Sequence, residues 1–180
     1  KIAASIPPVL GSYKPDIFNS EKAIPILEIF KNNLIQYCDL ILAETLSSID
    51  EIKTIQRVFG DCKIPFWISL TIEDEYYNIP KLRSGEEIVT ALRKIDFNKI
   101  SSVLFNCSQP EVMAKAIKVA KNLVPENTSL GVYANAFQPI KIGQRDANSQ
   151  IRNTRQELTP EKYFDFVKEW NDSLANIFAI

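Results

Sequence analysis

The sequence has no histidine among its 180 residues. Within this chain, that absence excludes serine–histidine and cysteine–histidine nucleophile pairs and every metal site with an imidazole ligand. Cysteine is scarce, and Cys38, Cys62 and Cys107 show no C-x-x-C spacing. An odd, sparse set of cysteines without an export signal is typical of reduced thiols, so we expect a cytoplasmic protein. The simplest interpretation of Cys38 and Cys62 is that they are small buried apolar residues.

The sequence also lacks long apolar runs and any large excess of positive or negative charge. No apolar run approaches the roughly 20 residues that span a bilayer, and the first residues lack the apolar core of a signal peptide. Because the chain does not begin with methionine, we expect the natural protein to begin earlier. Lysine and glutamate are interspersed around a formal net charge of -1, which leaves no basic surface for nucleic acid and no polybasic patch for a membrane.

What remains is the pattern of an α/β protein. With 46% hydrophobic and 24% charged residues, the composition fits one soluble globular domain, which we assign to residues 1–180. Short apolar runs rich in Ile, Val and Phe predict strands at residues 2–6, 40–43, 66–70, 103–105, 130–133 and 176–180. Apolar stripes of helical period predict helices at residues 24–37, 49–59, 88–95, 113–123 and 163–170. The alternation predicts a parallel sheet with right-handed crossovers.

Several helix starts carry capping signals. A Ser-x-x-Glu capping box, in which hydroxyl and carboxylate satisfy free backbone donors, is present at Ser48 and Glu51, at Ser84 and Glu87, and at Ser108 and Glu111. Thr159 before Pro160 predicts a cap followed by proline at the first helical position. Pro25 is expected in a first turn, because a proline further inside removes a backbone hydrogen bond.

An open doubly wound sheet and a (β/α)8 barrel both fit this alternation. Polar or reactive residues end nearly every predicted strand, namely Ser5, Glu44, Thr45, Ser69, Thr71, Asn106, Cys107, Tyr133 and Asn135. A barrel brings the carboxyl ends of all its strands to one mouth, where active sites are built, whereas an open sheet gathers only those near its switch point. The strand ends therefore favour the barrel.

Glu44 ends an apolar strand, so its carboxylate lies at the rim of a hydrophobic core, where an ionised group must be paired. One interpretation is a structural salt bridge to a lysine or arginine. The other, which we prefer, is a receptor for a substrate cation such as an α-ammonium group, because the two make a strong charge-assisted contact.

Cys107 follows Asn106 at the end of another strand and precedes a predicted helix start. A helix N-terminus favours the thiolate, which is suited to metal ligation or nucleophilic chemistry, although a buried inert cysteine also fits. In loops after strands, Tyr13, Tyr76 and Tyr77 predict either an aromatic wall for a cationic ligand or a simple cover of the core edge. The longest irregular segment, residues 136–158, has the length of a functional or mobile loop.

Together these segments resemble the homocysteine S-methyltransferase family over essentially the whole chain. The specific segments are residues 39–45 (DLILAET) with 48–51 (SIDE), and residues 105–111 (FNCSQPE). Residues 3–8 (AASIPP) with 11–16 (GSYKPD), 66–71 (FWISLT), 131–136 (GVYANA) and 159–180 are similar to the third, fifth, seventh and last strand regions of that family. The chain departs from the family's common Tyr-Pro-Asn with Tyr133, Ala134 and Asn135, which leaves the methyl donor open.

The resemblance implies a (β/α)8 TIM barrel represented by about six strand–helix units, without the two N-terminal units and without a Gly-Gly-Cys-Cys segment after the eighth strand. It implies a zinc ion held by three cysteine thiolates, of which Cys107 is the first and the other two are expected beyond Ile180. For this chain alone we therefore expect zinc to be absent or poorly occupied. Glu44 is implied to bind the homocysteine ammonium, and Asn106 to shape the same pocket; Thr45, Ser5, Tyr133 and Asn135 complete the expected substrate-binding set.

The implied reaction is methyl transfer from a sulfonium or ammonium donor to the zinc-activated thiol of homocysteine, giving methionine. A different class also fits: a non-catalytic barrel that binds an amino acid through Glu44 without metal. A metal-free lyase with Glu44 as base is less favoured, since no lysine ends a strand. An incomplete barrel leaves open sheet edges, which absent parts of the protein or a partner, such as a second copy in a homo-oligomer, would cover.

Overall fold

The computed structural model describes residues 1–139, 153–173, 175 and 177–178. Its strands form one parallel sheet in the order β1 (Ala3–Ile6), β2 (Leu40–Leu46), β3 (Phe66–Leu70), β4 (Ser102–Asn106), β5 (Ser129–Tyr133) and β6 (Ile177–Phe178). The helices are α1 (Ser20–Leu34), α2 (Ile49–Phe59), α3 (Ile88–Leu92), α4 (Pro110–Lys121) and α5 (Pro160–Asp172). Short 3-10 turns occupy η1 (Pro15–Ile17), η2 (Ile35–Tyr37) and η3 (Phe97–Lys99). The predicted last strand, residues 176–180, lies partly outside the described residues.

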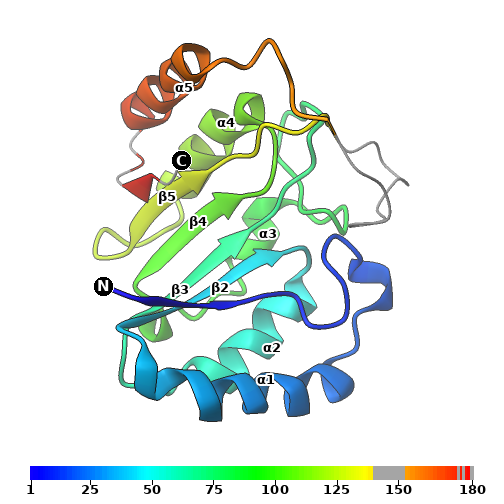
Figure 1. The fold of residues 1–180 in the computed structure, drawn as a ribbon, viewed down its shortest axis with the longest axis vertical. Coiled ribbons are helices and arrows are strands. Elements are labelled where there is room, and N and C mark those ends of the chain that lie inside the picture. The colour runs from blue at the N-terminus through cyan, green and yellow to red at the C-terminus, as the bar shows by residue number, and fades with distance from the viewer. Residues whose placement is uncertain (140–152, 174, 176, 179–180) are drawn as a thin grey trace.

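The strand order argues against one of the two architectures that the sequence left open, the doubly wound sheet. Strands follow one another across the sheet in chain order, so the sheet has no switch point at which the order reverses, as a doubly wound sheet requires. Neighbouring helices pack side by side, α1 against α2, α3 against α4, and α4 against α5 (Figure 1). This arrangement is the one found along the wall of a barrel. In the described residues, however, β1 and β6 are not paired, and the sheet is open.

The hydrophobic core lies between the sheet and its helices. Strand residues that face the helices are fully buried, among them Ile41, Ile68, Val103, Phe105 and Val132. Each is a branched or aromatic side chain of the kind that packs well on a pleated surface. No helix of the described residues is long and apolar enough to cross a membrane.

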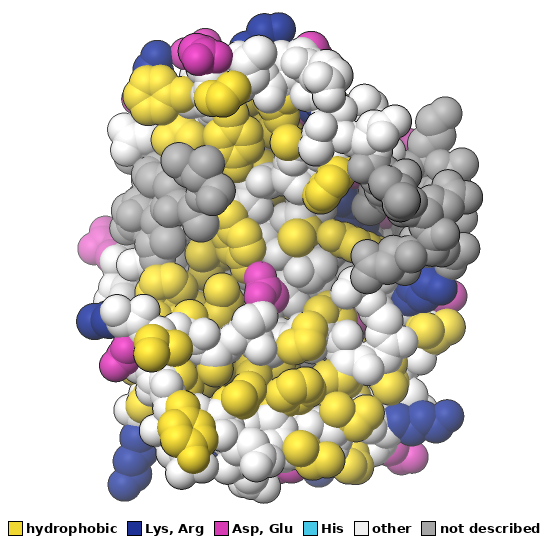
Figure 2. Space-filling model, viewed as in Figure 1, with side chains coloured by type: hydrophobic (Ala, Val, Ile, Leu, Met, Phe, Trp, Pro, Cys, Tyr) yellow, Lys and Arg dark blue, Asp and Glu magenta, His cyan; other side chains and the backbone are white. Residues whose placement is uncertain are grey.

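The opposite face of the sheet is less covered. Ser5 is exposed there, and Leu42, Trp67 and Tyr133 are partly exposed. Figure 2 looks onto this side and shows hydrophobic side chains gathered across the middle of the molecule, with an acidic side chain among them. The sheet therefore presents a mixed apolar and polar face, and its carboxyl end carries the polar strand-end residues.

The N-terminus of α2 confirms one predicted capping box. Ser48 Oγ accepts from the Glu51 backbone N–H at 3.2 Å, and the Glu51 carboxylate in turn accepts from the backbone N–H of Ser47. Thr159 caps α5 in the same way by accepting from the Lys162 backbone N–H. Glu51 is 3% exposed, and its burial raises the pKa of the carboxyl to about 7, although the Ser47 and Ser48 amides act in the opposite direction.

This raised pKa predicts a pH-dependent stability. Because the folded-state pKa of Glu51 lies above its ordinary value of 4.5, the folded protein binds the proton more tightly, and stability is lost as the pH rises from 4.5 through about 7. In the full-length protein, Glu51→Gln, which keeps an acceptor oxygen, is expected to gain up to about 3 kcal/mol over the parent between pH 5 and 8. Urea unfolding across this range measures the difference. A difference that does not change with pH would contradict it.

Two other predicted capping boxes are wrong. Helix α3 begins at Ile88 after Glu87, and the Ser84 hydroxyl donates instead to Glu86. Helix α4 begins at Pro110 after Gln109, and the Ser108 hydroxyl bonds to the backbone of Ile72. In both cases the hydroxyl has a partner in the loop, so it does not cap the helix.

The predicted place of Pro25 is also wrong. Asn19 caps α1, which begins at Ser20, so Pro25 lies inside the helix rather than in its first turn. The Asn19 side chain accepts from the Lys22 backbone N–H at 3.0 Å. The helix therefore starts at Ser20, four residues before the apolar stripe that predicted it from residue 24. Its polar first turn is stabilised by the cap rather than by apolar packing.

Candidate active site

The polar residues predicted at the strand ends do converge. Glu44 and Thr45 lie in β2, Asn106 ends β4, and Cys107 follows it directly; Ser5 and Tyr133 approach from β1 and β5. Since the strands are parallel and adjacent, these carboxyl ends share one edge of the sheet. Hydrogen bonds join them into two groups, one around Glu44 and one around Asn106.

Glu44 receives hydrogen bonds from the neighbouring strand β1 and from β5, which lies further along the sheet beyond β3 and β4. The Ser5 hydroxyl donates to Oε1, and the Tyr133 hydroxyl donates to Oε2 at 3.1 Å. Burial, with a further contribution from Glu44, raises the pKa of Tyr133 above its ordinary value, so the phenol stays protonated and donates. No lysine or arginine of the described residues forms an ion pair with Glu44. The part of the chain that is described therefore does not support the structural salt bridge.

Asn106 connects the ends of three strands. Its Oδ1 accepts from the Thr45 backbone N–H at 3.1 Å and from the Ser69 hydroxyl at 2.8 Å. Its Nδ2 donates to Thr45 Oγ1 at 2.9 Å and to Cys107 Sγ at 3.2 Å. Asn106 is completely buried, so losing these partners would be costly. The amide fixes β2, β3 and β4 relative to the thiol.

Cys107 is held in an unusual backbone conformation. Its φ is 51°, and Thr45 beside it has a φ of 63°, both in the left-handed region that side chains other than glycine seldom adopt. Such strain costs roughly 1–3 kcal/mol and is concentrated at functional sites. Thr45 Oγ1 donates to Cys107 Sγ at 3.7 Å, so Thr45 and Asn106 both donate to this sulfur.

These contacts suit a metal-bound thiolate. A thiolate is a soft ligand for zinc, and hydrogen bonds to the sulfur stabilise its negative charge. The residues present fit the ion with one ligand, Cys107. Within the described residues, no three cysteine, aspartate, glutamate or histidine side chains are grouped so that they could hold a metal.

Only one of the three loop tyrosines reaches this site. Burial, followed by the nearby Cys107, raises the pKa of Tyr13 above its ordinary value, and the Arg83 guanidinium lies 5.6 Å from the ring centroid. Tyr76 and Tyr77 instead contact lysines outside the site. Lys115 Nζ lies 4.4 Å from the centroid of the Tyr76 ring, and Lys81 Nζ lies 4.9 Å from that of Tyr77. The expected aromatic wall is therefore reduced to Tyr13.

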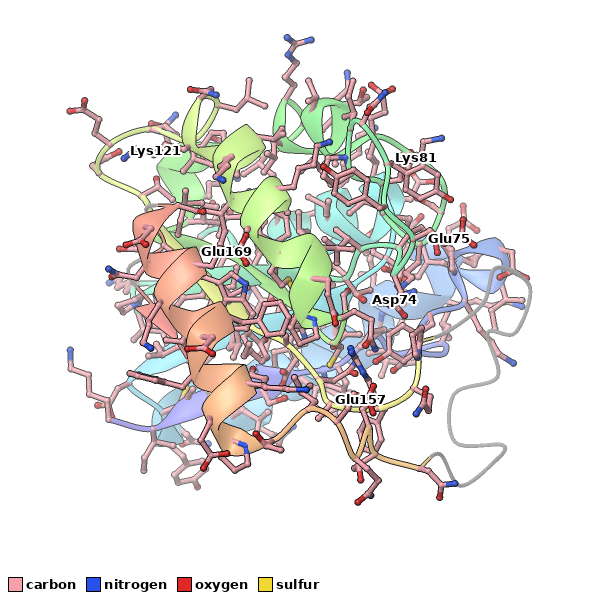
Figure 3. All side chains as sticks on the ribbon, turned by 90° about the horizontal axis from the view of Figure 1, so that it is seen from above. Asp74, Glu75, Lys81, Lys121, Glu157 and Glu169 are labelled. Atoms are coloured by element: carbon pink, nitrogen blue, oxygen red, sulfur yellow. The ribbon has the colours of Figure 1, made fainter. Side chains whose placement is uncertain are left out.

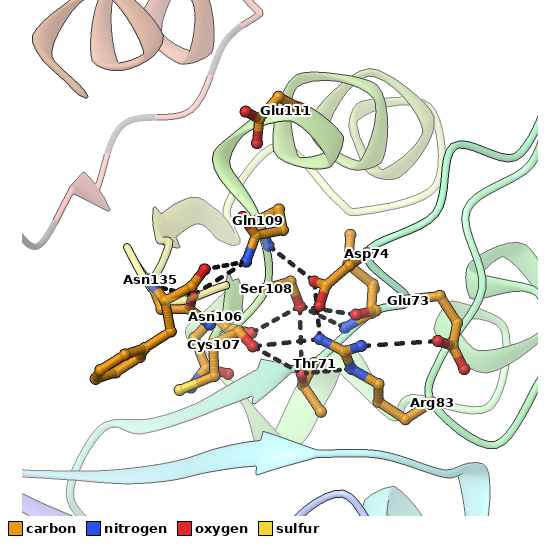
Figure 4. Close-up of polar contacts among 12 residues, drawn as sticks. Thr71, Glu73, Asp74, Arg83, Asn106, Cys107, Ser108, Gln109, Glu111 and Asn135 are labelled. Carbon is orange, nitrogen blue, oxygen red and sulfur yellow. Dashed lines mark hydrogen bonds and ion pairs between the residues drawn. The ribbon is translucent and has the colours of Figure 1, made fainter. Parts of the chain in front are cut away.

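Asn135 contacts a different group. Its Oδ1 accepts from the Phe137 backbone N–H at 3.0 Å and from Gln109 Nε2 at 3.3 Å. Figure 4 shows it on the far side of Ser108 from the buried Arg83 cluster. The side chain thus fixes the turn after β5 against the start of α4, and its role in binding substrate stays a prediction.

The sequence reasoning missed Asp74, Arg83 and Gln109, which surround the Cys107 backbone (Figure 4). Arg83 is 0% exposed and pairs with Asp74 at 2.9 Å. In Figure 3, Asp74 lies toward the interior near the start of α4, whereas Glu75 and Lys81 of the same loop lie toward the outside. No periodicity marks this loop, so only the density of charged residues could have drawn attention to it.

Two surface cavities open away from this site, beside α2. One of about 430 Å³ is lined by Asn19, Lys53 and Arg57 among others, and one of about 340 Å³ by Asp16, Asp50 and Glu86 among others. Neither is lined by Glu44 or Cys107. We place the candidate site at the strand ends because the strained backbone, the thiol and the buried polar network meet there.

The fold and this edge define a parallel α/β protein with a carboxylate near the carboxyl end of β2 and a thiol just after β4, two strands that flank β3. A model of the homocysteine S-methyltransferase family matches residues 1–179, and the chain belongs to that family. No curated protein matches the chain significantly in sequence.

Solved structures similar to this chain include forms of the homocysteine methyltransferase MmuM from Escherichia coli. The metallated form aligns with a TM-score of 0.70 at 18% identity, over 98% of this chain and 54% of that one. The oxidized form aligns with a TM-score of 0.67 at 17% identity, over 98% of this chain and 55% of that one. The similarity shows a shared fold, and this chain spans a little over half the length of that protein.

Proposed function

We propose that the full-length protein transfers a methyl group from a sulfonium or ammonium donor to the thiol of homocysteine, giving methionine. Family membership supports methyl transfer to homocysteine. The observation that carries the proposal for this chain is that Glu44 and Cys107 lie at one sheet edge, linked through Thr45 and Asn106. We further propose that the six strands are part of a (β/α)8 barrel, because their order is sequential and all are parallel.

Glu44 is the proposed receptor for the homocysteine ammonium. Ser5 and Tyr133 donate to its two oxygens and fix the orientation of the carboxylate, while the remaining lone pairs can accept from an ammonium group. A charge-assisted contact in a partly desolvated site is about twice as strong as a neutral hydrogen bond. Thr45 and Asn106 shape the space between this carboxylate and the thiol.

Cys107 is the proposed first zinc ligand, with two further cysteines from a Gly-Gly-Cys-Cys segment expected beyond Ile180. When bound, zinc keeps the homocysteine sulfur deprotonated near neutral pH. The hydrogen bonds that Asn106 and Thr45 give to Cys107 Sγ orient this ligand and offset its negative charge. We propose one homocysteine-binding domain over residues 1–180, with the missing units supplied by the rest of the protein.

The proposed transfer balances without a further reactant. The homocysteine thiolate attacks the methyl carbon, and a carbon–sulfur bond forms as the bond from that carbon to the donor sulfur or nitrogen breaks. The bonding pair stays on the donor, which leaves as a neutral sulfide or amine. The chain's own part is to bind the amino group at Glu44 and to direct the sulfur toward the Cys107 side of the site.

The test is methionine formation by the full-length protein. Purified protein is incubated with homocysteine and, separately, S-methylmethionine, S-adenosylmethionine, dimethylsulfoniopropionate and betaine, and methionine is measured by mass spectrometry. Homoserine, which keeps the amino acid group but lacks the thiol, is the matched control and should not be methylated. We expect turnover with at least one donor. If homocysteine binds but no donor gives methionine, the non-catalytic amino-acid-binding alternative is favoured instead.

A further inference from the structure

Arg83 is buried beside Cys107, and the proposed reaction assigns it no role. We propose that Arg83 is a positioning residue, which holds the Cys107 main chain so that the thiol faces Thr45 and Asn106. The role in metal binding rests on the proposed function, while the role in backbone geometry does not. Arg83 lies in the loop between β3 and α3 and is 0% exposed.

The guanidinium reaches Cys107 through its backbone. Arg83 Nη2 donates to the Cys107 carbonyl oxygen at 3.4 Å and to Asp74 Oδ1 at 2.9 Å, and Nε donates to Thr71 Oγ1 at 3.4 Å. The Thr71 hydroxyl lies 3.5 Å from the same Cys107 carbonyl. Figure 4 shows these contacts converging from the loop onto the segment that follows β4. Two donors from one loop therefore fix the direction of this carbonyl.

The same loop also holds the two residues that follow Cys107. Asp74 Oδ1, which accepts from Arg83, also accepts from the Gln109 backbone N–H at 2.9 Å. The Ser108 hydroxyl contacts the Ile72 backbone N–H at 2.9 Å and the Ile72 carbonyl at 2.8 Å. Cys107 thus lies in a short segment held at its carbonyl and at the two residues after it.

This attachment explains how the left-handed backbone of Cys107 persists. A φ of 51° is unfavourable for a cysteine, so surrounding contacts must hold it. Rotation of this residue to extended backbone would turn its carbonyl away from Arg83 and move Sγ away from Asn106 Nδ2. The arginine therefore acts on the thiol through the main chain and does not touch the reacting atoms.

One nitrogen of the Arg83 guanidinium, Nη1, donates no hydrogen bond to the described residues. Among the described residues, Arg83 Nη1 is buried without a hydrogen-bond partner, and the Glu73 carboxylate is 3.7 Å away. Within the part of the chain that the structure describes, Nη1 is therefore stabilised only by the charge of Glu73, whereas Nη2 and Nε donate to Asp74, the Cys107 carbonyl and Thr71. The side chain is thus oriented toward Asp74 and the Cys107 carbonyl at the expense of Nη1. This orientation is expected of a residue that serves the cysteine segment.

The test uses Arg83→Lys in the full-length protein. Lysine keeps a positive charge opposite Asp74 but lacks the planar fork that contacts Asp74, Thr71 and the Cys107 carbonyl together. The matched control is Arg155→Lys, because Arg155 contacts Gln109 and Glu111 at the same helix start without a contact to Cys107. The first readout is the 13Cα and 13Cβ chemical shift of Cys107 in metal-free protein, which reports its backbone conformation. The second is the zinc dissociation constant by chelator competition.

In Arg83→Lys we expect the Cys107 shifts to move toward extended values and the zinc dissociation constant to rise about 10- to 100-fold, with Arg155→Lys close to the parent. If Arg83→Lys lowers the melting temperature but keeps both the shifts and the zinc affinity within twofold, Arg83 is merely structural and the proposal is overturned. If the parent protein binds no zinc through Cys107, the proposed function fails, and the shifts still decide the positioning role.

Should Arg83→Lys not fold, a triple variant, Arg83→Gln with Asp74→Asn and Glu73→Gln, removes the three buried charges together. Removing both carboxylates with the guanidinium avoids the uncompensated charge that a single neutral substitution would leave. The same change in the Cys107 shifts is expected, and shifts equal to those of the parent would overturn the proposal.

Discussion

Cys107→Ser in the full-length protein is expected to remove bound zinc and to lower the rate of methionine formation at least about 1000-fold, which corresponds to about 4 kcal/mol in the barrier. A serine hydroxyl stays protonated near neutral pH and is a poor zinc ligand, whereas a thiolate is a strong one. Asn106 and Thr45 would still surround the side chain, so the fold should persist. Metal content by mass spectrometry and methionine formation at saturating substrate measure the two effects.

The matched control is Cys62→Ser. Cys62 is also a free, partly buried thiol, but it lies just before β3, at the opposite end of the sheet from Cys107. Burial raises the pKa of its thiol, which makes it a poor ligand. This variant should keep parental zinc and turnover. Equal zinc content and activity in the Cys107→Ser protein would refute the metal role of that residue.

The fold could be predicted from the sequence largely because parallel strands are covered by helices. Their side chains are apolar in short runs, and these runs at residues 66–70 and 130–133 agree closely with β3 and β5. The apolar pattern ended β2 too early, at Ala43, whereas the strand continues to Leu46. Backbone pairing between Leu46 and Leu70 does not depend on side-chain polarity, so Glu44 and Thr45 remain within the strand.

Helix starts were predicted well only where the local cap had no competitor. Ser48 and Thr159 cap their helices as expected. Ser108 has the same local spacing, but its hydroxyl bonds to Ile72, which is 36 residues away in the sequence. A capping motif describes neighbours along the chain and carries no information about such distant partners.

The candidate site shows the same division between local and distant information. Glu44 and Cys107 could be found because a polar residue at the end of an apolar strand has a defined place at the mouth of a parallel sheet. Arg83 and Asp74 could not, because an irregular loop has no period that predicts which of its charges turns inward. Their burial depends on the path of the loop over Cys107, which only the structure shows.

Glu44→Gln tests the proposed recognition of the substrate ammonium. The amide keeps an acceptor oxygen for Ser5 or Tyr133, so the fold should persist, but the negative charge is lost. Removing one partner of a partly buried charged pair costs about 2–5 kcal/mol, so we expect kcat/KM for homocysteine to fall about 100-fold, mainly through KM. Glu51→Gln is the matched control, since it removes a buried carboxylate from the α2 cap and should leave KM unchanged.

A second thiol substrate separates ammonium binding from a general loss of activity. 4-Mercaptobutyrate is homocysteine without its amino group, so the parent protein should use it far less efficiently. In Glu44→Gln, kcat/KM for this compound should change little, and the preference for homocysteine should fall about 100-fold, as the lost contact predicts. If the substitution instead lowers kcat/KM equally for both thiols, Glu44 does not bind the ammonium. Its carboxylate would then serve only to hold Ser5 and Tyr133, because the loss of those two contacts affects both thiols equally, with or without an amino group.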